Sequence, residues 1–399
     1  HLCASISMVQ QLDGDQALAY GARDAGAKIV TSYPGSPSSG TVEVLIALAK
    51  TYDIYVQWST NEKVALEVGI GASIAGRRVL VCTKSVGMNV MLDPLMALNL
   101  TPVNGGLVIL LGDDPGGYGS QNDQDTRPLA PMLEMPMLEP ATPAEAYAMM
   151  REAFAVSERL HTAVILRETR SFTQQVGAIE IADAPQSINW GFTREPYRYV
   201  PVPCNVVEKH RGLHERVRRF GHWADASPFN RISGRGVKGI VGAGFAYQKL
   251  LDVLGNEATK DVRLLKLGVL YPLPEKILVR FLSACDQVLI VEENEPFLET
   301  HIKAIAHDHS CNTRIYGKHR EGELYRWQIQ EALGRFLPGL VPAGKYTREN
   351  LEQTKNERKN HEANNSDGGF AIELFFCHPQ SIQRRFQIPA HHSRKDPRL

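Results

Sequence analysis

Short apolar runs alternate along this chain with longer segments whose apolar residues recur at helical spacing. The clearest run is GLVILLG at residues 106–112, and a continuous apolar run bounded by glycines is typical of a strand buried on both faces. Further strands are predicted at residues 28–33, 55–58, 78–83 and 163–167, and helices at residues 11–28, 41–51, 62–76, 87–100 and 143–158. This alternation predicts a parallel sheet with helices on both of its faces.

The connections at the carboxyl ends of these strands are where a site is expected, because open parallel sheets bind ligands beyond those ends. The loops at that edge are residues 33–39, 59–62, 84–87 and 112–127. Residues in these four loops are therefore the first candidates for binding or catalysis.

A second α/β unit begins at residue 237, where a short apolar run leads into Gly242 and Gly244. Strands are predicted at residues 263–268 and 287–291, with helices after Gly244, at 275–284 and at 297–307. The two glycines lack the third glycine of a dinucleotide-binding fingerprint, so we interpret them as a packing turn. The expected fold class is α/β with two parallel-sheet units.

The sequence divides into four predicted parts. Residues 11–172 and 236–345 carry the two α/β units. Residues 173–235 contain prolines, aromatics and a basic stretch, which predicts a linker with one surface helix whose charged residues face solvent. Residues 346–399 are polar and irregular, which predicts a disordered tail. The pair His391-His392 in this tail has no further ligand at metal-site spacing, so no metal is predicted there.

Composition excludes several classes of partner. Lysine plus arginine equals aspartate plus glutamate at 44 each, so charge gives no argument for nucleic acid or a membrane surface. No apolar run approaches the roughly 20 residues of a membrane span, and residues 1–10 do not resemble a signal peptide. The six cysteines form no C-x-x-C pair, which argues against a zinc or iron–sulfur site and fits a reducing cytoplasm. Cys82 and Cys285 are expected to be buried thiols.

Glu62 is the candidate of greatest interest, because it opens a helix whose second half is unusually rich in small residues. Such a helix is usually one that another backbone approaches closely. A structural alternative is a capping box, Ser59-x-x-Glu62, in which the acid only caps the helix. Glu67 is a weaker candidate, since Lys63 precedes it at the spacing of an exposed helix pair.

The first 170 residues resemble the pyrimidine-binding domain of the thiamine-diphosphate-dependent 2-oxoacid:ferredoxin oxidoreductases, and in particular the α subunits of the indolepyruvate type. The second α/β unit resembles the transketolase C-terminal-like domain of the same family. The motifs that carry the resemblance are YPGSPSS at 33–39, NEKVALE at 61–67, DDPG at 113–116, SQNDQDTR at 120–127, LGVLYPLPEK at 267–276 and VEE at 291–293.

The resemblance implies a role for Glu62. In this family a carboxylate nine residues before a Gly-Ala pair bonds the pyrimidine N1′ of thiamine diphosphate, and Glu62 stands nine residues before Gly71-Ala72. This spacing favours Glu62 over Glu67 as the catalytic acid and cofactor ligand.

Four further site residues follow from the same alignment. Ser36 and Arg127 are expected to bind the substrate carboxylate, which suits a hydroxyl donor and a bidentate guanidinium. Pro34 and Asn89 are expected to line the cofactor ring. The residues alone leave a structural alternative open for each of the four. In these alternatives Ser36 and Pro34 only form the turn, Asn89 only starts a helix, and Arg127 pairs with Asp123 or Asp125.

The activity implied by the resemblance is oxidative decarboxylation of an aryl pyruvate such as indolepyruvate, with coenzyme A as acyl acceptor and ferredoxin as electron acceptor. No diphosphate-binding G-D-G…N signature is found. Mg²⁺ and [4Fe-4S] clusters are therefore expected on a partner domain or subunit, with thiamine diphosphate in a shared site of an oligomer. Alternatives are a non-catalytic or truncated partner subunit, or a nonoxidative thiamine-diphosphate enzyme.

Overall fold

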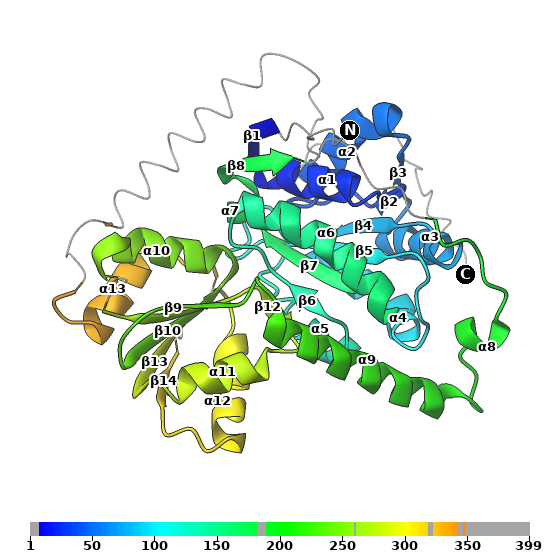
Figure 1. Ribbon diagram of the computed structural model, residues 1–399. Coiled ribbons are helices and arrows are strands. Elements are labelled where there is room, and N and C mark those ends of the chain that lie inside the picture. Colours follow the sequence, from blue (N-terminus) through cyan, green and yellow to red (C-terminus); the bar gives the residue numbers. More distant parts are fainter. Residues whose placement is uncertain (1–7, 182–188, 259–260, 318–321, 341–345, 348–399) are drawn as a thin grey trace, which may run out of the picture. The chain divides into compact units, whose positions relative to one another are not determined.

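The computed structural model describes residues 8–181, 189–258, 261–317, 322–340 and 346–347. Apart from its first two residues, the predicted tail at 346–399, with His391-His392, lies outside the described residues. The described residues from 8 to 340 form one compact unit, which contains both predicted sheets (Figure 1).

The first sheet has seven strands and carries the predicted candidate site at one edge. All neighbouring strands are parallel except β12 and β6, which pair antiparallel. In sheet order they are β12 (Val269–Tyr271), β6 (Met137–Leu138), β7 (Val164–Thr169), β5 (Leu107–Asp113), β4 (Val79–Lys84), β2 (Ile29–Ser32) and β3 (Tyr55–Trp58).

The central strand β5 shows why helices cover both faces of this sheet, since all seven of its residues are buried. Val108 and Leu110 pack in one hydrophobic cluster, and Leu107, Ile109 and Leu111 pack in another, as the alternation of a strand requires. The first cluster includes residues of α1 (Gly14–Asp24), α2 (Ser39–Tyr52) and α6 (Pro143–Leu160). The second includes residues of α3 (Glu62–Ile74) and α4 (Ser85–Leu98).

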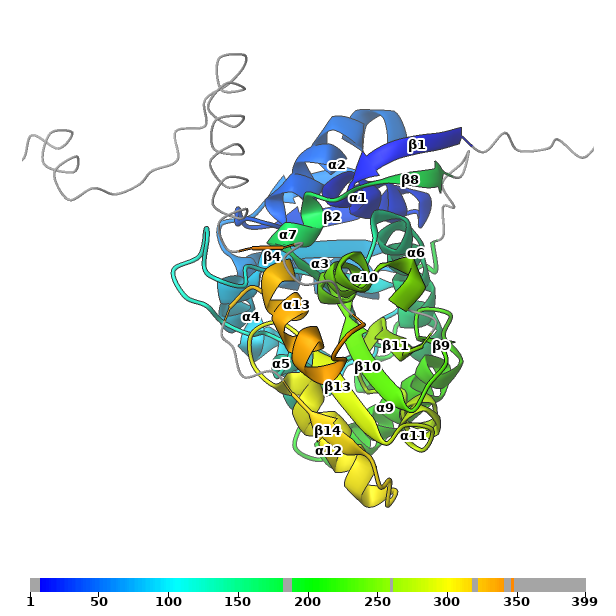
Figure 2. The same ribbon diagram turned by 90° about the vertical axis from the view of Figure 1, so that its left-hand side faces the viewer.

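The second sheet has five strands and shares the second cluster with the first sheet. Its order is β14 (Arg314–Tyr316), β13 (Gln287–Val291), β10 (Lys238–Ala243), β11 (Arg263–Leu267) and β9 (Arg231–Gly234), with only β9 antiparallel. Its helices are α10 (Gly244–Ala258), α11 (Glu275–Leu282), α12 (Phe297–Asp308) and α13 (Arg326–Phe336); Figure 2 shows them from the side.

One short connection joins the two sheets. The sequence predicts one strand at residues 263–268, but the structure places β11 in the second sheet and, after Gly268 alone, β12 in the first. A Cβ on Gly268 would lie 2.7 Å from the Cβ of Phe229, so the lack of a side chain permits this close passage. The chain therefore crosses between sheets at a glycine.

The segment predicted as a linker with one surface helix also contributes strands. β8 (Val176–Ile181) pairs antiparallel with β1 (Met8–Asp13), and β9 belongs to the second sheet. The helix α9 (Val206–Ala226) buries only Leu213, Phe220 and Ala224, which fits the predicted surface helix. Three short helices were not predicted: α5 (Leu129–Leu133), α7 (Arg170–Thr173) and α8 (Pro196–Tyr199).

The helix predicted at residues 11–28 is shorter in the structure, because β1 occupies residues up to Asp13 and α1 ends at Asp24. Asp13 caps α1 by accepting a hydrogen bond from the Gln16 backbone at 2.7 Å. Other local predictions are confirmed. Cys82 and Cys285 are buried free thiols. Gly244 has a φ of +51° and begins α10 against the Glu139 side chain, which fits a packing turn. No helix in the described ranges has the length and apolarity needed to cross a membrane.

We expect Gly244→Ala to destabilise the chain by about 2 kcal/mol or more, because its Cβ would enter the space of Glu139 in a left-handed backbone conformation. Gly71→Ala is the matched control, since a Cβ there meets nothing within 4 Å and replaces a glycine inside α3. It should stabilise by about 0.5–1 kcal/mol. Urea unfolding of both variants tests the pair, and equal midpoints would contradict the prediction.

Candidate functional site

The four predicted loops meet at one edge of the first sheet, because β5, β4, β2 and β3 are parallel neighbours. The Ser59 backbone N–H donates to the Ser32 carbonyl at 2.7 Å, which links the ends of β3 and β2. The Lys84 Nζ donates to the Gly119 carbonyl at 3.1 Å, which links the end of β4 to the loop after β5. The edge is thus built as the alternation of strands and helices predicts.

Glu62 is the first residue of α3 and is only 9% exposed. The helix is capped by Asn61, whose Oδ1 accepts a hydrogen bond from the Val64 backbone at 2.9 Å. The alternative capping box Ser59-x-x-Glu62 is therefore wrong, because Glu62 holds the first helical position and Asn61 supplies the cap. The acid is left without a capping function.

Gly87, in the first turn of α4, makes room for the Glu62 carboxylate. A Cβ on Gly87 would lie 2.7 Å from Glu62 Cγ and 2.8 Å from Oε1. Glu62 therefore lies at the N-terminal, electropositive ends of two helices, its own and α4. Within the described part of the chain, no side chain forms an ion pair or a hydrogen bond with this carboxylate, so it remains available for a ligand.

Ser36 and Pro34 are exposed in the loop between β2 and α2. The turn is held by two other serines: Ser39 Oγ accepts from the Gly35 backbone at 2.8 Å, and Ser38 Oγ donates to the Gly35 carbonyl at 3.1 Å. The Ser36 hydroxyl is not bonded to any described residue. The alternative in which Ser36 serves the turn is thus less favoured, and its substrate role stays a prediction.

Asn89 lies one turn inside α4, so the alternative of a helix-start asparagine is wrong. Its amide exchanges two hydrogen bonds with the Gln124 amide, at 2.8 and 3.0 Å. This pair ties the loop at 112–127 to α4. Asn89 is exposed at the same edge as Glu62, and its role as a cofactor ligand stays a prediction.

Arg127 is 3% exposed and is fully engaged with other protein groups. Its guanidinium pairs with Asp125 at 2.6 Å and with Glu292 at 2.7 Å, and it donates to the Glu293 and Glu295 carbonyls at 2.6 and 2.8 Å. Burial alone lowers the Arg127 pKa, but the two carboxylates outweigh burial and raise it.

The alternative that pairs Arg127 with an aspartate is thus correct for Asp125, and Glu292 is a partner that the sequence did not suggest. Arg127 links the loop after β5 to the end of β13 in the second sheet. Its predicted contact with a substrate carboxylate would require these bonds to rearrange, and it stays a prediction.

Lys84 is a cation at this edge that sequence reasoning missed. It precedes α4 directly, is half-buried, and its Cδ would lie 2.8 Å from a Cβ on Gly35. The sequence feature that could have identified Lys84 is that it is the only charged residue in the predicted loop at 84–87. Lys84 therefore lies closer to the Ser36 loop than its sequence separation suggests.

A pair of acids, the half-buried Asp15 and the buried Glu168, was also missed. Asp15 Oδ1 accepts a hydrogen bond from Thr41 at 3.0 Å, and burial raises the pKa of Asp15 to about 7. Neither carboxyl oxygen of Glu168 has a hydrogen-bond partner in the part of the chain that the structure describes. Burial, with a smaller contribution from Asp15, raises the pKa of Glu168 well above its ordinary value. The structure thus brings together two acids that are 153 positions apart.

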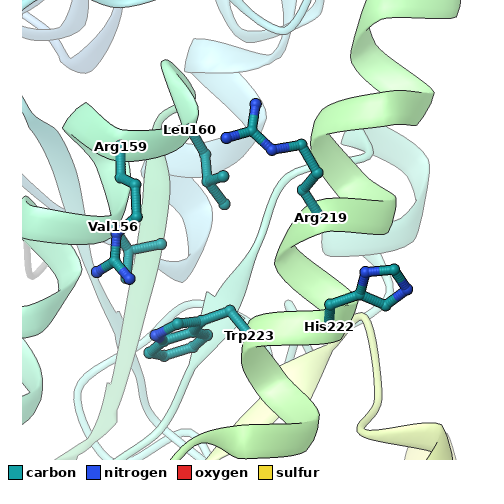
Figure 3. A pocket seen from close by; sticks show the side chains of 6 residues that line it. All are labelled: Val156, Arg159, Leu160, Arg219, His222 and Trp223. Atoms are coloured by element: carbon teal, nitrogen blue, oxygen red, sulfur yellow. The ribbon is translucent and has the colours of Figure 1, made fainter.

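A separate hollow of about 210 Å³ lies between α6 and α9 (Figure 3). Trp223 and Arg219 of α9 face Arg159 and Leu160 of α6 across it. These α6 residues precede β7, so the hollow lies toward the amino ends of the strands, away from Glu62. It does not belong to the candidate site.

Comparisons with known proteins agree with this geometry. Residues 20–199 match the family model described as pyruvate flavodoxin/ferredoxin oxidoreductase, thiamine diphosphate-binding. Residues 233–337 match the model described as indolepyruvate oxidoreductase domain. The indolepyruvate oxidoreductase subunit IorA of Pyrococcus abyssi is 37% identical over 335 residues, which cover 81% of this chain and 52% of that relative. The chain spans about half the length of the curated relatives it matches.

Two solved structures share the fold. The 2-oxoglutarate:ferredoxin oxidoreductase from Magnetococcus marinus matches with a TM-score of 0.62 and 14% identity, covering 82% of this chain and 65% of that one. A split-gene transketolase in an inactive β4 tetramer matches with a TM-score of 0.51 and 16% identity, covering 81% of this chain and 97% of that one. The predicted α/β fold class is confirmed.

We expect Arg127→Met to lower the free energy of unfolding by about 3–5 kcal/mol, because Asp125 and Glu292 would stay buried without their cation. Arg335→Met removes an exposed pair with Glu331 and should change stability by about 0.5 kcal/mol or less. Urea unfolding compares the two. A stability of Arg127→Met equal to that of the wild type would show that the network carries little energy.

The raised pKa of Asp15 predicts a specific pH dependence. Between about pH 4 and pH 7 the folded chain holds this proton and the unfolded chain does not, so the free energy of unfolding falls as pH rises through that window. Asp15→Asn should make the free energy of unfolding fall less steeply with pH, by at most about 1.4 kcal/mol per pH unit. Urea unfolding across the window measures it, with the exposed Asp286→Asn as control. Identical slopes in wild type and Asp15→Asn would contradict the assignment.

Proposed function

Since this chain is a homologue of the IorA subunits of indolepyruvate oxidoreductase, we propose that it is the cofactor-activating part of a thiamine-diphosphate-dependent 2-oxoacid:ferredoxin oxidoreductase. Its substrate would be an aryl pyruvate such as indolepyruvate. The products would be the acyl-coenzyme A and carbon dioxide, with electrons passing to ferredoxin.

The position of Glu62 is the observation that carries this proposal. It is a nearly buried carboxylate with no hydrogen-bond or ion-pair partner among the described residues, at the edge of the sheet where ligands bind, inside the segment that matches the thiamine-binding family model. A buried acid that only stabilises a fold is normally paired or hydrogen-bonded. Its lack of a partner is therefore an argument for a ligand.

The residues around Glu62 fit an aminopyrimidine ring. Gly87 leaves the carboxylate unobstructed on the α4 side. A single carboxylate oxygen is the acceptor that a ring N–H needs, and Glu62 would hold that proton at the pyrimidine N1′. Pro34 and Asn89 are exposed at the same edge and would flank the ring. Thiamine diphosphate, when bound, would supply the nucleophilic carbon and the electron sink that decarboxylation of a 2-oxoacid requires.

The substrate carboxylate would meet Ser36, whose hydroxyl is exposed and takes no part in the turn. A cation is also needed, and the chain offers Arg127 and Lys84. Lys84 is half-buried with its stem against Gly35, the neighbour of Ser36, whereas Arg127 is held by two carboxylates. The substrate would thus be oriented from the loop after β2 and the start of α4.

The diphosphate, Mg²⁺ and the iron–sulfur clusters would be held by a partner domain or subunit, with the active site shared between the two. This division is supported by the motifs of the given residues, which include the thiamine diphosphate-binding family match at 20–199 but no G-D-G…N signature. Calorimetric titration of thiamine diphosphate with Mg²⁺ tests it. Binding by the co-expressed pair but not by this chain alone is expected, and tight binding by this chain alone would contradict a shared site.

We expect Glu62→Gln to lower 2-oxoacid decarboxylation in the assembled complex by at least 100-fold, on the scale of a lost general acid–base group. An amide cannot hold the proton that the carboxylate shares. The measurement is carbon dioxide release with indolepyruvate, coenzyme A and an electron acceptor present. The unfolding midpoint should stay within about 1 kcal/mol of wild type, since no protein bond is lost.

Glu67→Gln is the matched control, because Glu67 is an exposed acid on the same helix. It should retain turnover close to that of the wild type. Near-wild-type turnover in Glu62→Gln would reject the assignment of Glu62. Equal losses in both variants would point to damage of α3 instead.

A further inference from the structure

A cluster of metal-ligating side chains lies outside the candidate active site. His210 and His214 stand one turn apart on α9, and Glu134 follows α5 directly. His210 Nε2 lies 2.7 Å from Glu134 Oε1, and His214 Nε2 lies 2.9 Å from Oε2. One ligand atom from each residue falls within 4.8 Å of the others.

We propose that these three side chains form a binding site for a divalent transition-metal ion of the zinc class. Two histidines at positions i and i+4 of a helix present both rings on one face and can chelate a single ion. A carboxylate from another element completes a His₂Glu set, which binds zinc in proteins and leaves a fourth position for water. This site is distinct from the proposed catalytic function.

The distances fit a small adjustment on metal binding. Ligand atoms on a tetrahedral zinc lie about 3.3 Å apart, given bonds of about 2.0–2.1 Å. The two histidine nitrogens are 2.7 and 2.9 Å from the carboxylate oxygens, and all three ligand atoms lie within 4.8 Å of one another, so each separation would have to change by about 1.5 Å or less to reach the tetrahedral spacing. The side chains are 51%, 59% and 23% exposed for His210, His214 and Glu134, so water and metal have access.

Two other charged side chains of α9 have partners of their own. Arg218 pairs with Glu215, and Arg216 donates to the Asn99 carbonyl at 2.7 Å. The helix is attached to the rest of the chain by few buried side chains, Leu213, Phe220 and Ala224. A metal that joins α9 to the turn after α5 would therefore add a cross-link where apolar packing is sparse.

The metal-free alternative is a pair of histidine–glutamate hydrogen bonds that need no ion. It predicts that zinc neither binds with defined stoichiometry here nor changes stability. The two interpretations differ in a quantity that can be measured, namely one equivalent of bound zinc that depends on His210, His214 and Glu134 together.

The test is calorimetric titration of the full chain with ZnCl₂ after chelator treatment, together with thermal unfolding with and without zinc. We expect the wild type to bind one equivalent that is lost or weakened at least tenfold in His210→Ala, His214→Ala and Glu134→Gln. The same equivalent should raise the unfolding temperature of the wild type and not of these variants.

His222→Ala is the matched control, since His222 is exposed on the same helix three turns from His210 and outside the cluster. It should bind zinc as the wild type does. Zinc binding that persists unchanged in all three cluster variants, or that is absent from the wild type, would overturn the proposal.

Discussion

The parallel alignment of β5, β4, β2 and β3 is the constraint on which the rest of the structure depends. Because all four strands run in one direction, their carboxyl ends share an edge, and four loops that are far apart in the sequence must meet there. Because β5 is buried on both faces, helices must cover both sides, which brings the start of α3 and the start of α4 to the same edge. Glu62 and Gly87 meet for this reason.

Buried charge marks where the two sheets are joined. Arg127 of the loop after β5 reaches Glu292 at the end of β13, and Arg167 of β7 pairs with Asp113 at 2.8 Å and Glu139 at 2.7 Å. Such pairs cost desolvation and stabilise little relative to an apolar core, but they have strict geometric requirements. The network therefore fixes one arrangement of the loops near the candidate site instead of adding much stability.

The local predictions succeeded where neighbouring residues decide the outcome. The strands around residues 28–33 and 106–112 depend on short-range patterning, and they are confirmed. The Ser59 capping box failed because Asn61 is nearer to the first helical turn and accepts the bond itself. The single strand predicted at 263–268 ends at Leu267 in the structure, and the chain continues as β12 in the other sheet. The point at which a chain passes from one sheet to another depends on how the two sheets pack, which a local pattern does not show.

By itself the sequence determined the α/β alternation and the edge at which the four loops meet, since these follow from periodicity and strand direction, and the family resemblance made Glu62 the candidate acid. Only the tertiary structure decided which charges meet. It added Glu292 to the Asp125 partner of Arg127, placed Glu168 near Asp15 with no hydrogen-bond partner among the described residues, and brought Glu134 to His210 and His214. The pairs Arg127–Glu292, Asp15–Glu168 and Glu134–His210 join residues tens to more than a hundred positions apart, and their energies depend on burial, which a local sequence pattern does not reveal.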